Sequence, residues 1–362
     1  MADYKNSNLI VESASTAPGT VGWRSPSNLA IIKYWGKHGV QLPRNPSISF
    51  TLENACTTTY IDYRVKESSS PGIELDFFFD KKPNEAFQQK VQAYLESLTE
   101  VFPFLKQLHL SIRSTNSFPH SSGIASSASS MSALALCLCS MEKKLFDTLQ
   151  DEAEFKQKAS YLARLGSGSA CRSVYPEMAV WGKSSAAEGS SDLYAIPYNE
   201  EIHEVFRTFH DDILIISKGE KSVSSRAGHG LMEGNIYAQN RYDQANKRFR
   251  ALLDALKKGD IETFGDIAEV EALTLHALMM TSKPPYILMK PNTLAAIAEV
   301  QRFRAETGHP LYFSLDAGPN LHLLYPDQAK TPIQAFIKER LLPYCDQEKT
   351  IRDVVGKGPV EL

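Results

Sequence analysis

The chain has 362 residues, of which 43% are apolar and 22% charged, and its formal net charge is −3. This composition is typical of a globular protein and excludes the disordered and fibrous classes. The near balance of charge gives no indication of a nucleic acid or an anionic membrane as partner. The length exceeds that of one ordinary core, so we expect two domains, divided near residues 200–210.

Residues 1–19 are rich in Ser, Asn, Ala and Thr and predict a loosely held extension. They lack the apolar stretch of a secretory signal, and no apolar run in the chain approaches the roughly 18 residues of a membrane span. The five cysteines form no CxxC pair, and their odd count argues against a disulfide framework. We therefore expect a cytoplasmic protein with domains over residues 20–205 and 206–362.

The first half of the chain predicts strands followed by paired helices. Alternating apolar residues favour strands over 57–65, 74–79 and 109–113. Apolar spacings of three and four indicate a helix that begins after Asn84, and helices are also expected over 125–138 and 151–165. This order favours an α+β layer over a doubly wound sheet.

The second half predicts long helices between short strands. Strands are expected over 193–198 and 211–217, and again over 311–315 and 321–325. The intervening helical patterns cover 232–258, 261–280 and 293–307, with Gly259-Asp260 between the first two and Gly308 after the third. We find no internal repeat at a fixed period.

Residues 119–129 carry the most informative chemical pattern. They read Pro-His-Ser-Ser-Gly-Ile-Ala-Ser-Ser-Ala-Ser and run directly into a predicted buried helix. Small residues let the backbone approach a ligand, and a helix N-terminus favours phosphate. Ser126 and Ser127 add hydroxyls for phosphate or magnesium. A Ser-rich linker would not continue into an apolar helix, and no Gly-Lys-Ser/Thr follows, so this is not a Walker A loop.

Four further segments combine glycine, hydroxyl and charged groups. Each also has an ordinary interpretation as a turn or a solvated surface loop, which the segment alone does not exclude. They are residues 27–38, with Lys33 and Lys37 on either side of Tyr34, Trp35 and Gly36; residues 166–173, where Arg172 offers a fork for a carboxylate; residues 221–228; and residues 314–320, with Asp316 at the end of a strand.

Taken in this order, the five segments resemble the diphosphomevalonate decarboxylase family of the galactokinase–homoserine kinase–mevalonate kinase–phosphomevalonate kinase (GHMP) superfamily. Lys33-Tyr-Trp-Gly-Lys37 is similar to the N-terminal signature of the family, and Asn116-Ser-Phe-Pro with Gly123-Ile-Ala-Ser-Ser127 is similar to its phosphate loop. Gly166-Ser-Gly-Ser-Ala-Cys-Arg172, Val223-Ser-Ser-Arg-Ala-Gly228 and Asp316-Ala-Gly-Pro-Asn320 resemble its substrate-site motifs. The resemblance covers residues 22–320.

The resemblance implies an α+β GHMP kinase fold. The N-terminal domain would be ribosomal protein S5-like, the C-terminal domain ferredoxin-like, and the active site would lie in the cleft between them. It also implies that mevalonate 5-diphosphate and ATP are converted to isopentenyl diphosphate, ADP, phosphate and carbon dioxide, with Mg²⁺ accompanying ATP. The family further suggests a homodimer.

The resemblance also assigns roles to residues. Asp316 would act at the 3-hydroxyl as a general base or orienting carboxylate, with Lys33 beside it, while Arg172 and Ser169 would orient the substrate carboxylate. The substrate would further be held by Tyr34, Lys37, Ser167, Ser225 and Arg226. The ATP phosphates would meet Ser121, Ser122, Gly123, Ile124, Ala125, Ser126 and Ser127, of which Ser127 is the candidate magnesium ligand.

The sequence departs from the family pattern at three places and leaves three alternatives open. The departures are His120-Ser-Ser122 before the phosphate loop, Arg44-Asn-Pro-Ser47, and His229 where methionine is expected. One alternative is a mevalonate-type kinase that does not decarboxylate, and a second is a decarboxylase of mevalonate 5-phosphate. A third is an inactive ligand sensor, against which the presence of Asp316 argues.

Overall fold

Two long strands organise the N-terminal half of the computed structural model, which describes residues 4–12, 16–67, 70–118, 124–199, 201–219 and 223–362. Strands β1 (Gly19–Ile32) and β4 (Ser47–Val65) pair antiparallel along most of their length. Their register shifts between Pro26 and Asn28, because proline has no N–H to donate to the ladder. The strand nevertheless continues beyond this irregularity to Ile32 and places Lys33 directly after its last residue.

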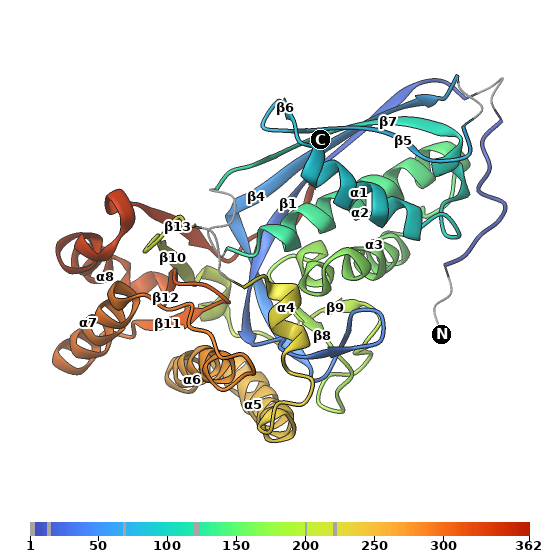
Figure 1. Cartoon of the computed structure of the whole chain (residues 1–362). Helices are drawn as coiled ribbons and strands as arrows, with labels where there is room; N and C mark the ends of the chain where they lie inside the picture. Colours follow the sequence, from blue (N-terminus) through green and yellow to red (C-terminus); the bar gives the residue numbers. More distant parts are fainter. Residues whose placement is uncertain (1–3, 13–15, 68–69, 119–123, 200, 220–222) are drawn as a thin grey trace.

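These strands belong to an eight-stranded sheet (Figure 1). Its main order is β14–β1–β4–β7–β5–β6, and β8 and β9 continue it from the first part of β4. All neighbours are antiparallel except β5 and β7. The remaining strands are β5 (Glu74–Phe79), β6 (Lys82–Pro83), β7 (Leu108–Asn116), β8 (Met178–Trp181), β9 (Ala195–Pro197) and β14 (Val360–Glu361), and β2 (Lys37–His38) and β3 (Leu42–Pro43) form a separate pair.

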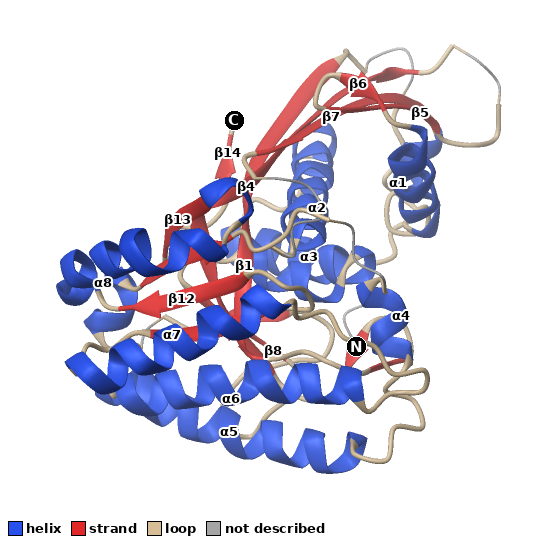
Figure 2. Cartoon of the chain, turned by 60° about the vertical axis from the view of Figure 1, so that its left-hand side comes forward, coloured by secondary structure: helices blue, strands red, loops and turns tan. Residues whose placement is uncertain are grey.

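Helices cover one face of this sheet (Figure 2). They are α1 (Glu85–Ser97), α2 (Ser126–Phe146) and α3 (Glu152–Gly166). Asn84 and Asp151 cap α1 and α3 by accepting the N–H groups of Phe87 and Glu154. Helix α2 is buried over most of its length, and its small and apolar residues pack into the core beneath the sheet. This packing fixes the N-terminus of α2 relative to β1.

The C-terminal half contains a four-stranded antiparallel sheet with the order β11–β12–β10–β13. Its strands are β10 (His210–Leu214), β11 (Tyr312–Leu315), β12 (Leu321–Tyr325) and β13 (Thr350–Val354). Helices separate β10 from β11 and β12 from β13, so the order and connections are those of a ferredoxin-like unit. The prediction of an α+β fold with this second unit is confirmed.

Helices lie on both sides of this second sheet. Successive side chains of a strand point to opposite faces of the sheet. Tyr312 and Phe313 on β11 are therefore buried in different apolar cores, one on each face. The helices of this half are α4 (Ser225–Gly230), α5 (Ala238–Lys258), α6 (Ile261–Met280), α7 (Pro291–Thr307) and α8 (Lys330–Phe336). Gly259, with φ of +73°, ends α5, and Asp260 caps α6 by accepting the N–H of Thr263.

The end of the chain returns to the N-terminal half. The Asp353 carboxylate on β13 accepts the N–H groups of Glu53, Asn54 and Ala55 on β4, at 2.8, 2.9 and 2.7 Å. Strand β14 then adds to β1 as an edge strand, with Trp23 opposite Glu361. One apolar core also contains residues of both halves, including Phe50 and Phe249. The two halves therefore share backbone pairing and a core, and the division at residues 205 and 206 stays a prediction.

The N-terminal extension differs from the expectation. Leu9 and Val11 are buried in the core of the N-terminal half, and the Gln107 side chain bonds to both the N–H and the carbonyl of Val11, each at 2.9 Å. The prediction of a loosely held segment is therefore wrong for this stretch. Composition could not show it, because a few apolar residues, Leu9, Val11 and the partly buried Tyr4, anchor an otherwise polar segment.

Candidate active site

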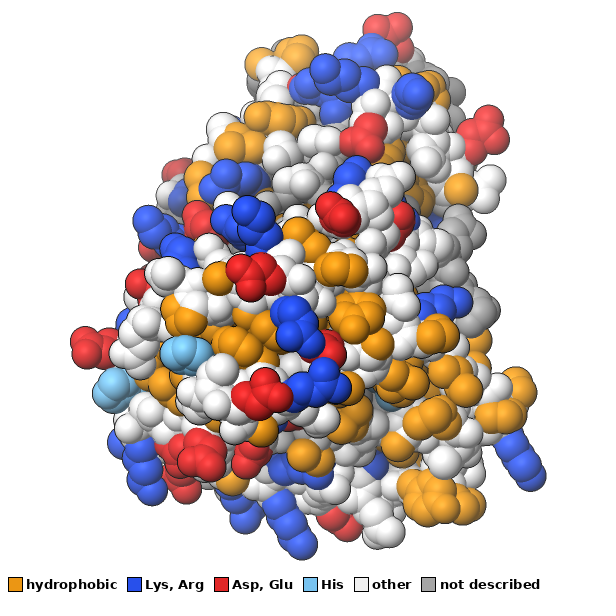
Figure 3. Space-filling model, turned by 90° about the vertical axis from the view of Figure 1, so that its left-hand side faces the viewer, with side chains coloured by type: hydrophobic (Ala, Val, Ile, Leu, Met, Phe, Trp, Pro, Cys, Tyr) orange, Lys and Arg blue, Asp and Glu red, His pale blue; other side chains and the backbone are white. Residues whose placement is uncertain are grey.

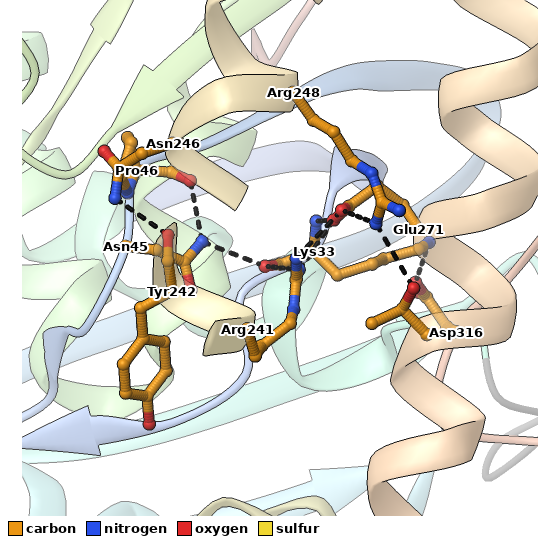
Figure 4. A network of polar contacts seen from close by, with 10 residues as sticks. Lys33, Asn45, Pro46, Arg241, Tyr242, Asn246, Arg248, Glu271 and Asp316 are labelled. Carbon is orange, nitrogen blue, oxygen red and sulfur yellow. Dashed lines mark hydrogen bonds and ion pairs between the residues drawn. The ribbon is translucent and has the colours of Figure 1, made fainter. Parts of the chain in front are cut away.

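Lys33 and Asp316, which are 283 residues apart in the sequence, meet where the two halves join. Lys33 follows β1, and Asp316 follows β11. The Lys33 Nζ atom lies 3.0 Å from Asp316 Oδ1, and the two side chains are 2% and 22% exposed (Figure 4). A buried ammonium beside a partly exposed carboxylate can bind and polarise a reacting hydroxyl or phosphoryl group.

A buried ion-pair network holds the backbone of Lys33 (Figure 4). Glu271 of α6 is fully buried, and its carboxylate accepts the Lys33 N–H at 2.9 Å. The same carboxylate accepts two bonds from Arg241 of α5, at 2.8 and 2.6 Å, and one from Arg248 at 2.9 Å. Arg241 and Asn45 each donate to the Lys33 carbonyl at 3.2 Å. This network fixes the position from which Lys33 reaches Asp316.

The sequence analysis did not identify this network. Arg241 and Arg248 lie seven residues apart on α5 and therefore on one face of the helix. That spacing is the only signal in the sequence, and it is equally typical of a solvated basic face. The burial that makes these residues structural depends on α6 packing against α5.

Asp316 is held through its main chain. Its carbonyl oxygen lies 3.1 Å from Nε2 of His276, on α6, and accepts the N–H of Gly318 at 2.7 Å. Helix α6 thus contacts both members of the pair, Lys33 through Glu271 and Asp316 through His276. His276 was also missed by the sequence analysis, because a lone histidine within a helix carries no distinctive pattern.

Arg172 lies in the 3₁₀ segment Gly168–Val174 and is 1% exposed. Its guanidinium donates from Nε to Ser49 Oγ at 2.8 Å, from Nη1 to Ser47 Oγ at 2.7 Å, and from Nη2 to Asn28 Oδ1 at 3.4 Å. Across the described part of the chain, no carboxylate forms an ion pair with it. Burial lowers the pKa of the Arg172 guanidinium, and the charge of Asp316 acts in the opposite direction. Such a buried cation is suited to binding an anion.

Ser169 and Ser167 flank the start of the same segment. Asn28 donates from Nδ2 to the Ser169 carbonyl at 3.2 Å, so the amide that contacts Arg172 also positions the main chain of Ser169. Ser167 ends α3, and its hydroxyl lies 3.2 Å from that of Ser127. The segment at residues 166–173 and the start of α2 are therefore adjacent, as a shared site requires.

Tyr34 carries a buried hydroxyl that has no hydrogen-bond partner among the described residues. Its ring packs edge-on against Trp181, with the centroids 4.6 Å apart. Burial raises the pKa of the Tyr34 hydroxyl well above its usual range, so it remains a donor at neutral pH. Because an unpaired buried hydroxyl is costly, a bound ligand is a suitable partner for it. Lys37, on β2, donates to the Gln41 side chain at 2.9 Å.

His229 joins helix α4 to the segment of Lys33 and Lys37. Its Nδ1 accepts the Gly36 N–H at 3.1 Å, and its ring lies 4.3 Å from that of Tyr34 and 4.5 Å from that of Trp35. Burial, with a smaller contribution from the charge of Lys37, lowers the pKa of His229 to about 3. The imidazole is therefore neutral at physiological pH, with its remaining proton on Nε2.

Two predicted substrate contacts lie on α4 itself. Ser225 is exposed at the first position of the helix. Ser224, which was not selected from the sequence, caps the helix by accepting the Ala227 N–H. The side chain of Arg226 lies outside the described residues.

The described part of the predicted phosphate loop begins at Ile124. The Ile124 side chain is buried in the core, and its carbonyl accepts the Ser27 hydroxyl at 2.8 Å, so only its backbone remains for a ligand. Ala125 has a φ of +40° and no side-chain oxygen with which to cap α2. The N-terminus of this 21-residue helix is thus suited to phosphate, with Ser126 and Ser127 in its first turn. Ser121, Ser122 and Gly123 lie outside the described residues.

Two family models match consecutive parts of the chain. The diphosphomevalonate decarboxylase-like N-terminal domain matches residues 25–195, and the mevalonate 5-diphosphate decarboxylase C-terminal domain matches residues 212–358. Together they cover most of the sequence, in the order that the family requires.

The chain belongs to the diphosphomevalonate decarboxylase family.

Curated and solved members of the diphosphomevalonate decarboxylase family match over most of their length. The Saccharomyces cerevisiae enzyme is 29% identical over 336 residues, which cover 88% of this chain and 81% of that protein. The Staphylococcus aureus structure aligns with a TM-score of 0.81 at 27% identity, covering 97% of this chain and 100% of that one. The Enterococcus faecalis structure aligns with a TM-score of 0.78 at 27% identity, covering 96% and 99%.

A further decarboxylase structure is described as a complex with MVAPP, AMPPCP and magnesium, and it aligns with a TM-score of 0.79 at 29% identity. The alignment covers 96% of this chain and 99% of that one. Among the described residues of the chain itself, no group of three or more His, Cys, Asp or Glu side chains could hold a metal ion. Among the same residues, no helix is long and apolar enough to cross a membrane.

Proposed function

We propose that this chain catalyses the ATP-dependent decarboxylation of mevalonate 5-diphosphate to isopentenyl diphosphate, with release of ADP, phosphate and carbon dioxide. The observation that carries the proposal is the buried Arg172, which has uncharged hydrogen-bond partners and is close enough to the Lys33–Asp316 pair for the charge of Asp316 to act on it. A substrate that carries a carboxylate and a reacting hydroxyl matches both features, because the carboxylate can bind Arg172 while the hydroxyl lies beside Lys33 and Asp316.

Asp316 orients the 3-hydroxyl of the substrate and accepts its proton as the hydroxyl oxygen bonds to the γ-phosphorus of ATP. Lys33 stabilises the charge that builds up on the transferring group, and ADP departs with the electrons of the broken P–O bond. The carbon–oxygen bond to the new phosphate then breaks. The bond to the carboxyl carbon also breaks, and its electron pair forms the double bond while carbon dioxide leaves. Arg172 and Ser169 hold the carboxylate during this step.

ATP is the second substrate, and the N-terminus of α2 fits its phosphates, since N–H groups that no side chain caps point from it. Residues 121–127 would form this contact, and Ser127 would contribute a hydroxyl to the Mg²⁺ that accompanies ATP and screens its charge. Tyr34, Lys37, Ser167, Ser225 and Arg226 would hold the remainder of mevalonate 5-diphosphate. The unpaired Tyr34 hydroxyl supports its inclusion.

The oligomeric state and the cellular compartment of the enzyme are also part of the proposal. A homodimer follows from the family to which the chain belongs. All five cysteines are buried and free, which supports a reducing compartment such as the cytoplasm.

The test is a two-product assay. Purified protein is incubated with Mg-ATP and carboxyl-labelled mevalonate 5-diphosphate, and ADP and labelled carbon dioxide are followed together. Asp316→Asn is compared with Asp254→Asn, which changes an exposed carboxylate on α5. We expect equimolar products, a decrease of about 10²–10⁴-fold in kcat for Asp316→Asn, and wild-type activity for Asp254→Asn.

Other outcomes would assign other functions. ADP without carbon dioxide would identify a kinase and overturn the role of Arg172 and Ser169. Activity with mevalonate 5-phosphate but not with the diphosphate would identify the alternative decarboxylase. A folded protein that forms no product from either substrate would support the third alternative, an inactive ligand sensor.

A further inference from the structure

His229 is a neutral imidazole of which the protein uses only one nitrogen. Its Nδ1 accepts the Gly36 N–H at 3.1 Å, so the ring proton is on Nε2. Among the described residues, none accepts a hydrogen bond from Nε2. The side chain is only partly buried on α4, so this donor remains open to a ligand. The proposed reaction so far uses no atom of this side chain.

A second donor without a partner lies beside this histidine. The Tyr34 hydroxyl is buried and has no hydrogen-bond partner among the described residues, and the rings of Tyr34 and His229 are 4.3 Å apart. A Cβ atom on Gly168 would lie 2.9 Å from the same hydroxyl, so the hydroxyl adjoins the segment that carries Arg172. Tyr34 therefore connects the donor on α4 to the site of the substrate carboxylate.

The turn after Tyr34 brings a positive charge to this place. The charge of Lys37 contributes to the lowered pKa of His229, which indicates that the two side chains are near each other. Gly36, which precedes Lys37, has a φ of +98°, and Arg44 donates its N–H to the Gly36 carbonyl at 3.4 Å. His229 thus supports the turn through Nδ1 and directs a free donor from Nε2.

An anion with oxygens on two phosphorus atoms fits this set of groups. One cation and two neutral donors can bind several oxygens together, and bonds to charged oxygens are stronger than bonds between neutral groups. In the proposed complex, Arg172 holds the substrate carboxylate, and the 3-hydroxyl lies beside Asp316. The 5-diphosphate is therefore the part of the substrate that remains to be bound here.

The overall charge of the chain does not favour two phosphates over one. Its formal net charge is −3, and on the face shown in Figure 3 basic and acidic side chains are interspersed without one large basic area. Long-range attraction thus gives little advantage to the more highly charged ligand. Selection must come from hydrogen bonds at the site itself.

We propose that His229 is a specificity-determining residue, which donates its Nε2–H to the terminal phosphate of mevalonate 5-diphosphate and thereby favours the diphosphate over the monophosphate. The Tyr34 hydroxyl, which adjoins the segment of Arg172, meets the phosphate nearer to the reacting carbon. The inference rests on the proposed decarboxylase and names the contact by which it selects its substrate.

Two amide variants separate the donor from the support of the turn. The side-chain amide of asparagine reaches the position of Nδ1, and that of glutamine reaches the position of Nε2. His229→Asn therefore keeps an acceptor for the Gly36 N–H but loses the donor toward the ligand. His229→Gln keeps this donor and loses the support.

Binding is measured by titration calorimetry of the full-length chain with mevalonate 5-diphosphate and with mevalonate 5-phosphate. His229→Asn should weaken binding of the diphosphate by about 10- to 100-fold, as loss of a hydrogen bond to a charged group does, and leave binding of the monophosphate unchanged. His229→Gln should bind the diphosphate more tightly than His229→Asn. His203→Asn is the matched control, since the Nδ1 of this surface histidine also accepts a backbone N–H. It should bind both ligands as the wild type does.

Equal losses for the two ligands in His229→Asn, or a loss confined to His229→Gln, would show that the residue only supports the turn at Gly36. Weaker binding of Mg-ADP to His229→Asn would place the donor at the nucleotide instead, and a wild type with no preference for the diphosphate would also overturn the inference. Failure of the proposed reaction gives a different result, which is the absence of carbon dioxide release by the wild type in the two-product assay.

Discussion

The guanidinium of Arg172 is a buried cation whose hydrogen-bond partners within the protein are all neutral. Its bonds go to two serine hydroxyls and one asparagine oxygen. Removing a guanidinium from water is costly unless an anion compensates it. The arrangement is therefore explained by ligand binding and not by stability, and the two serines fix the direction in which the fork points.

Arg172→Lys should lower kcat/KM by about 100-fold, because lysine keeps the charge but loses the two-pronged contact with a carboxylate. Steady-state kinetics measure the effect, and Ser49→Ala is the control. That change removes only the acceptor of Nε and should cost less. Wild-type kinetics for Arg172→Lys would show that this side chain does not hold the substrate carboxylate.

His229 is a residue whose role the sequence could not show. It was visible only as a departure from the family pattern, whereas its contacts with Gly36 and two aromatic rings depend on how α4 packs against the segment that follows β1. Burial keeps its ring neutral, with a pKa lowered to about 3.

This histidine should make stability depend on pH. Between pH 6.5 and pH 3 the unfolded chain binds a proton at His229 that the folded chain does not bind. Its contribution to the free energy of unfolding is therefore fully present above pH 6.5 and is lost as the pH falls toward 3, by at most about 1.4 kcal/mol per pH unit.

Urea unfolding of wild type and His229→Asn between pH 5 and pH 8 checks this. The difference between the two proteins should be constant above pH 6.5 and decrease below it. His203→Asn is a matched control, since His203 Nδ1 also accepts a backbone N–H, from Val205 at 3.2 Å, but lies at the surface. A difference that does not change with pH would contradict a buried neutral imidazole.

At the scale of elements, the α5–α6 hairpin determines the position of Lys33. Glu271 on α6 links Arg241 and Arg248 on α5 to the main chain after β1. Buried carboxylates of this kind are costly to leave partly paired. The hairpin is therefore a support for the reactive pair as well as a layer of the fold.

Glu271→Gln should destabilise the protein by about 3–5 kcal/mol, because the buried Arg241 and the partly buried Arg248 lose their counter-charge. It should also lower kcat, since the backbone of Lys33 loses a charged acceptor. Denaturant unfolding and the two-product assay measure these effects. Glu262→Gln, on the exposed part of the same helix, should change neither, and equal stability of the two variants would show that the network carries little energy.

Elements with strong local signals could be predicted from the sequence. Helix α6 and strand β12 have the predicted bounds, because Gly259-Asp260 marks one start and a short apolar run defines the other. Strand β1 was not identified, since Ser25-Pro26-Ser27 interrupts its apolar pattern. Helix α5 begins at Ala238 and not at residue 232. The region before it contains Gly234 and Asn235, which favour a turn.

The residues of the candidate site also fall into those that a local sequence pattern indicates and those that it does not. Motifs that are continuous in sequence, around Lys33, Arg172 and Asp316, were found because together, and in this order, they resemble the signature segments of the family. Supports such as Glu271 and His276 were missed, because they contact the site through packing between distant elements. Their residue types alone do not distinguish them from ordinary helical positions.

At the scale of the whole molecule, the two halves are joined by more than a linker. They share a core that contains Phe50 of β4 and Phe249 of α5, and Asp353 ties β13 to three backbone N–H groups of β4. The separation of two domains at residues 205 and 206 therefore need not correspond to two independent folding units.

Calorimetry should show one cooperative unfolding transition for the full chain, with equal calorimetric and van't Hoff enthalpies. A fragment of residues 206–362 should remain unfolded alone, because its sheet would expose the apolar face that it normally shares. Two separate transitions, or a folded fragment, would show that the halves are independent. Removal of residues 357–362 should lower the melting temperature by a few degrees, since the edge strand β14 and the bond from the Lys357 N–H to Glu53 are lost.

The return of the chain end to its first strand also constrains synthesis in the cell. Strand β1 leaves the ribosome more than 300 residues before β14, which completes its edge. The N-terminal half must therefore wait with an unpaired strand edge and an incomplete core until β14 emerges. Closure of this edge consequently cannot precede synthesis of residues 360–361, and a chain stalled before them would display that edge to other chains.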